Sequence, residues 1–139
     1  MRSILRYITI ALAAFLIGSV ATPLTVALLT AFSLFDTQES ILRLGLIGGI
    51  ASAITWLTAS FCLHDFRVQQ WMILGFLSPF VGVPIFFLLT SYAAGAVSFT
   101  IALQAGVITA GMLCPLLCPV GLLSGWIISA VWRLIPSGA

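Results

Sequence analysis

The chain has 139 residues, of which 62% are hydrophobic and only 6% are charged, and its mean hydropathy is +1.27. An ordinary soluble domain carries about 25% charged residues, and five basic and three acidic side chains cannot cover a water-facing surface of this size. A net charge of +2 on scattered arginines also excludes a basic stripe for nucleic acid, and the composition excludes disorder and a disulfide scaffold. The solvent of this chain is therefore lipid.

The charged residues divide the chain into long apolar stretches that are able to cross a bilayer. About 20 helical residues span a hydrocarbon layer of roughly 30 Å. We therefore predict an all-α, polytopic bundle of four transmembrane helices, with one transmembrane domain over residues 1–139. The predicted spans are residues 7–35, 44–63, 70–90 and 99–120, followed by a C-terminal segment, 121–139.

The first span has features of a cleavable signal peptide. Arg2 and Arg6 precede its apolar core, and the small residues 19–21 are similar to a cleavage site. Apolar sequence nevertheless continues to Phe35, which makes the segment long enough to cross the bilayer. We therefore expect an uncleaved first helix.

The last apolar stretch, residues 68–132, admits two divisions. It forms two spans with a turn near residues 91–98, or it contains a further break at the prolines of residues 114–119, which gives five spans in total. Four spans place arginines 2, 6, 67 and 133 on one side, opposite a loop, 36–43, of net charge −1. Because cytoplasmic loops are enriched in arginine and lysine, we favour four spans in the cell (inner) membrane with both termini cytoplasmic.

Small residues recur at four-residue spacing in two of the predicted spans. Such ridges let helix backbones approach closely in lipid, where burying leucine provides little driving force. They predict tight packing within one chain. In a bundle of four spans, these ridges also leave some small-residue surface without a partner, which favours a homo-oligomer or a larger membrane complex. The ridge residues are Gly45, Gly49 and Ala53, with Gly48 and Ser52 beside them, and Ala102, Gly106, Ala110, Gly121 and Gly125.

Prolines inside the spans predict kinked helices. A proline removes one backbone donor and frees a carbonyl of the preceding turn, which a neighbouring hydroxyl can satisfy, as Thr22 and Ser78 are placed to do. Interrupted helices also build substrate sites in many transporters. The prolines concerned are Pro23, Pro79, Pro84, Pro115 and Pro119.

The predicted spans contain no Arg, Asp or Glu, so we expect no catalytic residues, no cofactor and no ion-coupled transport. The one histidine, His64, is expected in a solvated loop beside Asp65. Soft ligands at Cys62, Cys114, Cys118 and His64 form the only conceivable metal cluster. The CxxxC spacing is weak evidence, however, and we expect reduced, structural thiols and no metal.

The sequence therefore predicts a non-enzymatic small membrane protein that acts as a membrane-embedded subunit or accessory factor through helix–helix contacts. The expected partners are the bilayer and other membrane helices. One alternative is an oligomeric channel or facilitator for ions or small solutes. Another is a phage-type membrane-permeabilising protein, similar to holins, since those are short and rich in spans.

Overall fold

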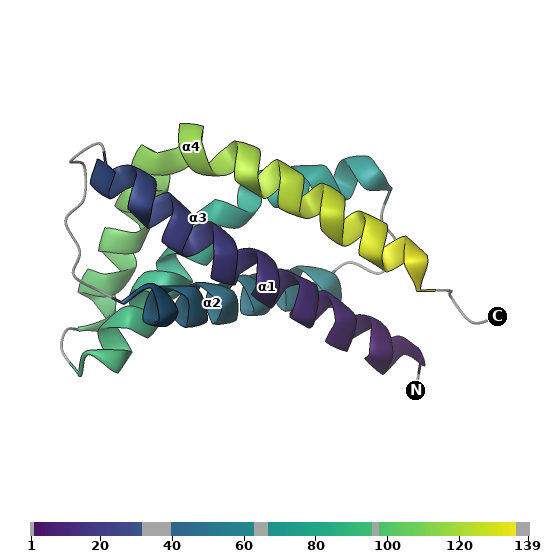
Figure 1. Cartoon of the computed structure of the whole chain (residues 1–139), viewed down its shortest axis with the longest axis horizontal. Coiled ribbons are helices and arrows are strands. Elements are labelled where there is room, and N and C mark those ends of the chain that lie inside the picture. The colour runs from purple at the N-terminus through teal and green to yellow at the C-terminus, as the bar shows by residue number, and fades with distance from the viewer. Residues whose placement is uncertain (1, 32–39, 63–66, 96–97, 136–139) are drawn as a thin grey trace.

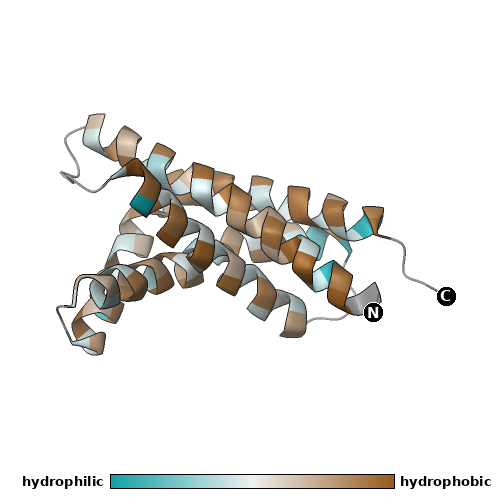
Figure 2. Cartoon of the chain, turned by 60° about the horizontal axis from the view of Figure 1, so that its bottom comes forward, coloured by the Kyte–Doolittle hydropathy of each residue, from teal (hydrophilic) through white to brown (hydrophobic). Residues whose placement is uncertain are grey.

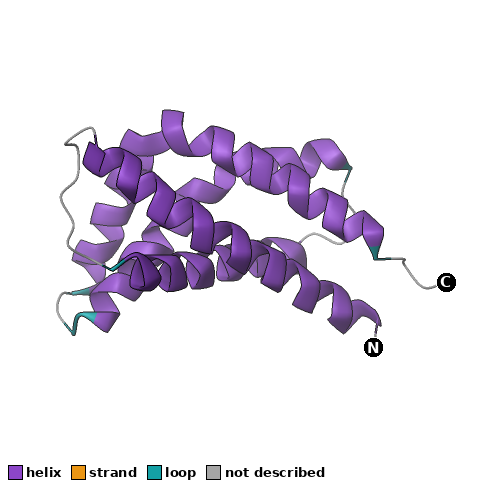
Figure 3. Ribbon diagram, viewed as in Figure 1, coloured by secondary structure: helices purple, strands orange, loops and turns teal. Residues whose placement is uncertain are grey.

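The computed structural model describes residues 2–31, 40–62, 67–95 and 98–135. They form four α-helices: α1 (Arg2–Ala31), α2 (Ile41–Cys62), α3 (Val68–Ala93) and α4 (Phe99–Leu134) (Figure 1). Helices account for 95% of the described residues, and no strand occurs among them (Figure 3). All four helices are long and apolar enough to cross a membrane. The predicted all-α bundle of four transmembrane helices is confirmed.

Short polar signals set the ends of these helices. The side-chain oxygens of Ser40 and Ser98 accept hydrogen bonds from the backbone amides of Arg43 and Ile101, three residues further on. These bonds satisfy amides that have no partner within the first helical turn. After α3, Gly95 adopts a left-handed conformation with φ of 65°, which ends the helix at little steric expense because glycine has no Cβ.

The fourth helix is longer than the predicted span. It does not end near residue 120 but continues through Pro115 and Pro119 to Leu134, 36 residues in all. A helix of this length measures about 54 Å, and Figure 1 shows that α4 changes direction near its middle. Prolines bend a helix in this way. The second half of α4 packs against α3, so the prolines bend the helix without ending it, and the break required for five spans is not present.

The helices form two antiparallel hairpins, α1 with α2 and α3 with α4, whose internal contacts are more extensive than those between the hairpins. The up-and-down order brings the start of α1, the end of α2, the start of α3 and the end of α4 to one end of the bundle (Figure 1). Arg6, Arg67 and Arg133 lie at helix ends there, and we call it the arginine end. Arg43, at the start of α2, lies at the opposite end.

The outer faces of the bundle are apolar. Hydrophobic residues cover the helices along their length in Figure 2, and many large ones are exposed, among them Leu16 at 59%, Ile73 at 59% and Val107 at 55%. In water such a surface would aggregate. It suits contact with lipid chains.

Candidate binding cleft

The predicted ridge of α2 lies against α1. A Cβ atom at Gly45 would lie 3.0 Å from the carbonyl oxygen of Ser19, and one at Gly49 would lie 2.8 Å from the ring of Phe15. Both glycines are buried, whereas Ala53 is half-buried. The absence of side chains at these two positions allows the close approach of the α1 and α2 backbones.

The predicted ridge of α4 lies against α3. A Cβ at Gly121 would collide with the carbonyl oxygen of Gly75, and one at Gly125 would collide with that of Trp71. Nearer the start of α4, a Cβ at Gly106 would lie 2.5 Å from the Cα of Pro84. The remaining ridge residues, Ala102 and Ala110, are buried.

Two glycines that our sequence reasoning did not single out take part in the same contacts. A Cβ atom at Gly18 would collide with the carbonyl group of Gly48, and one at Gly75 would collide with that of Gly121. Gly18 stands four residues after Ala14, so the spacing rule could have found it. Gly75 has no small residue four positions away except Pro79, and only the tertiary structure reveals its role.

The ridge glycines are thus engaged within the hairpins. A helix of a second copy cannot occupy the faces that α1 and α3 already cover. The homo-oligomer or larger complex that the ridges suggested therefore stays a prediction, and its contact surface has to be sought elsewhere.

One of the predicted proline sites shows how the freed carbonyl is satisfied. Pro79 has no amide to donate to the carbonyl of Gly75, four residues earlier, and the hydroxyl of Ser78 donates to that oxygen instead at 2.7 Å. Pro79 and Pro84 are buried, Pro23 is half-buried, and Pro115 and Pro119 are exposed on α4.

The cysteines of α4 lie side by side. The sulfur atoms of Cys114 and Cys118 are 3.0 Å apart, and both residues belong to the middle of α4, with about four helical turns between Cys118 and Leu134. The predicted span 99–120 put both cysteines near its end, whereas the longer α4 puts them in its middle. Cys62 ends α2 at the arginine end, and His64 lies outside the described residues. Within the described ranges, no three Cys, His, Asp or Glu residues gather as a metal-binding group.

Aromatic rings join the two hairpins on the arginine side. The ring of Trp56 on α2 stacks 6.0 Å from Trp71 on α3, which in turn lies 5.6 Å from Trp132 on α4. Tyr7 on α1 completes the cluster, 6.5 Å from Trp132. Trp71, in the first turn of α3, is only 1% exposed, and Trp56 is 2% exposed.

Arg6 extends this junction to the chain end. Its guanidinium carbon lies 4.9 Å from the centre of the Trp132 ring, and its Nη2 donates a hydrogen bond of 2.8 Å to the carbonyl oxygen of Ile135. A cation over an indole face is attracted by the negative face of the ring. The first turns of α1 and the last turn of α4 are held together in this way.

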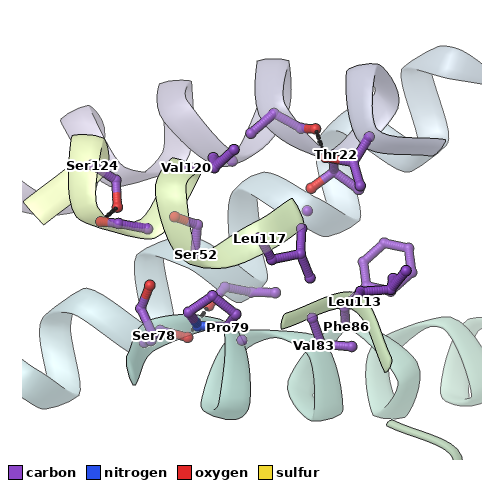
Figure 4. A pocket seen from close by; sticks show the side chains of 18 of the residues that line it. Thr22, Ser52, Ser78, Pro79, Val83, Phe86, Leu113, Leu117, Val120 and Ser124 are labelled. Carbon is purple, nitrogen blue, oxygen red and sulfur yellow. Dashed lines mark hydrogen bonds between the residues drawn. The ribbon is translucent and has the colours of Figure 1, made fainter. Parts of the chain in front are cut away.

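Beyond the aromatic junction the hairpins enclose a cleft of about 210 Å³, lined by residues of all four helices. Its inner end includes Trp56. Figure 4 shows serines, among them Ser78 and Ser124, toward one side of the cleft, and the apolar Phe86 and Leu113 toward the other. None of the described residues that line it is charged.

Most hydroxyl groups of the lining are occupied by their own helix. Thr25, Thr55, Ser78 and Ser124 each donate a hydrogen bond of 2.7–2.8 Å to a backbone carbonyl three or four residues earlier. A hydroxyl whose O–H is already engaged in such a hydrogen bond can only accept a hydrogen bond from a guest. The wall of the cleft is therefore less polar than its composition indicates.

Comparisons of this chain with models of protein families, with curated proteins and with solved structures find no match. The function is therefore inferred from the geometry of the cleft and of the two hairpins.

Proposed function

We propose that this protein is a non-enzymatic accessory factor of the cell (inner) membrane that holds an apolar guest from the bilayer between its two hairpins. The observation that carries the proposal is the uncharged cleft, to which all four helices contribute. Ligand sites are typically concave and mostly apolar, with a few polar groups, and many lie between the helices of bundles.

The distribution of charge supports a role without catalysis. The arginines of the described chain stand at the ends of helices, close to the water phase. An acid–base pair or an ion-coupling site in a membrane protein normally places an ionisable residue within the spans. The same arginines support an orientation with both termini in the cytoplasm. Arg6, Arg67 and Arg133 lie at the end of the bundle where α1 begins and α4 ends, and cytoplasmic segments are enriched in arginine.

The contact surface of this accessory factor differs from the one that the ridges suggested. The glycines of α2 and α4 pack within the hairpins, whereas the cleft is an inward surface that no helix of this chain fills. Binding in the cleft requires no separation of the helices within either hairpin. We therefore place the guest between the hairpins.

The experiment is native mass spectrometry of the full chain, extracted from its membrane in a mild detergent. Gly82 lines the cleft, and a Cβ there would meet only the Thr55 hydroxyl, at 3.5 Å. A Gly82→Leu side chain therefore grows into the cleft. The matched control is Gly111→Leu on α4, because no atom outside the local backbone lies within 4 Å of a Cβ at Gly111.

We expect the wild type and Gly111→Leu to retain a bound mass that Gly82→Leu loses. Equal bound mass in all three proteins would contradict the proposal. Reconstitution of the purified chain into liposomes provides a second readout. Flux of a small solute through those liposomes would favour the channel or facilitator instead.

A further inference from the structure

We infer that the guest of the cleft is a single hydrocarbon chain of a membrane lipid, taken from the leaflet opposite the arginine end. This inference rests on the proposed function and specifies its guest. Four features of the cleft carry it: its volume, its shape, its position along the helices and the chemistry of its wall.

The volume of the cleft suits one apolar chain. An apolar cavity of about 150 Å³ is large enough to bind benzene, so 210 Å³ holds a somewhat larger apolar group.

The shape of the cleft is elongated along the helices. Its lining on α1 extends from Ile17 to Leu29, a rise of about 18 Å, and on α4 from Thr109 to Ser124. The chains of a lipid lie in the same direction as helices that cross the bilayer. A guest of this form enters without turning across the membrane.

The position of the lining selects the leaflet. The residues on α1 belong to its second half, and those on α2, from Leu44 to Trp56, are divided equally between its two halves. The α1 stretch lies away from the arginine end, and the stacked rings of Trp56 and Trp71 lie between the cleft and that end. With the termini in the cytoplasm, the chain comes from the non-cytoplasmic leaflet.

The chemistry of the wall matches an uncharged chain. A charged or strongly hydrated guest would lose its water without gaining an opposite charge or enough donors in return. The wall has no charged side chain among the described residues, and the hydroxyls of Thr25, Thr55, Ser78 and Ser124 already donate to their own helices. The apolar side chains of Phe86 and Leu113 supply dispersion contacts.

The test uses the full chain in vesicles that contain a phospholipid with a photoreactive diazirine in one acyl chain. After irradiation, mass spectrometry of peptides locates the labelled residues. We expect label on lining residues of α3 and α4, such as Val83 and Leu117, in the wild type and in Gly111→Leu. We expect that label to be lost in Gly82→Leu, while label on outward-facing residues stays unchanged.

A second variant protects the test from a folding defect. Leu113 lines the cleft from α4 and faces the α1–α2 hairpin across it, so the larger side chain of Leu113→Trp fills the cleft. Thermal unfolding in detergent establishes which variants are folded. Label on the lining that persists in a folded, filled variant overturns the inference, as does an unlabelled lining in the wild type.

The two proposals fail separately. If the purified protein carries a guest mass but the lipid probe leaves the lining unlabelled, the guest is another molecule, and only the lipid inference falls. If there is neither a guest mass nor label on the lining, the proposed function falls with it.

Discussion

The contact between Gly75 and Gly121 allows a sharp test of how the α3–α4 hairpin is held together. A Cβ at either position would collide with the carbonyl oxygen of the other glycine, and a Cβ at Gly121 would also lie 3.3 Å from Cδ of Pro79. Backbone atoms cannot turn aside as a flexible side chain can. Gly121→Ala must therefore push the helices apart, which typically costs about 1–3 kcal/mol, or roughly a 5- to 150-fold change in the unfolding equilibrium.

The control for this prediction is Gly111→Ala in the same helix, where the added methyl group meets nothing within 4 Å. Both substitutions gain up to about 1 kcal/mol of helix propensity, so the difference between them isolates the clash. The assay is reversible unfolding in mixed detergent micelles. The double variant Gly75→Ala/Gly121→Ala should be less destabilised than the sum of its parts, because the first methyl already separates the backbones. A Gly121→Ala protein as stable as Gly111→Ala would refute the reasoning.

Three further predictions concern the arginine end. Trp71→Ala should destabilise the chain by about 3 kcal/mol or more, far more than Trp126→Ala, because Trp71 is 1% and Trp126 is 55% exposed; detergent unfolding measures both. Arg6→Lys keeps the charge but loses the flat stacking on an indole and the directed bond to the Ile135 carbonyl. It should therefore speed hydrogen exchange in the last turn of α4, while the exposed Arg133→Lys should leave that exchange unchanged. A topology reporter fused after Arg133 should be cytoplasmic, and an external signal would overturn the proposed orientation.

The sequence predicted the helical architecture because a bilayer imposes strict rules on a chain within it. Every backbone polar group must be satisfied inside the segment, so long apolar stretches become helices. Charges bound those stretches, as at Arg43 and Arg67, and therefore indicated the number of helices. The end of the last helix was predicted less well. Proline predicts a bend, but whether a helix stops there depends on packing beyond it, which Gly121 and Gly125 provide.

The candidate site was much less accessible to sequence reasoning. Glycine spacing marked the surfaces of close approach, such as Gly45 and Gly49, but could not show whether their partner is another helix of this chain or another molecule. The sequence alone does not show what Trp56 contacts, and the structure places it against Trp71. That stack joins residues of different hairpins, and no local pattern encodes it.

By itself, then, the sequence determined that this is a helical membrane protein, favoured four spans over five, and indicated where the first three helices lie and which end carries most of the arginines. Those properties follow from local composition, since hydropathy and charge act on each segment separately. Only the tertiary structure decided that the ridges close two hairpins, that aromatic rings join these hairpins at one end, and that an uncharged cleft is left between them. Such features depend on which side chains from distant segments meet, and packing sets that only once all four helices are in place.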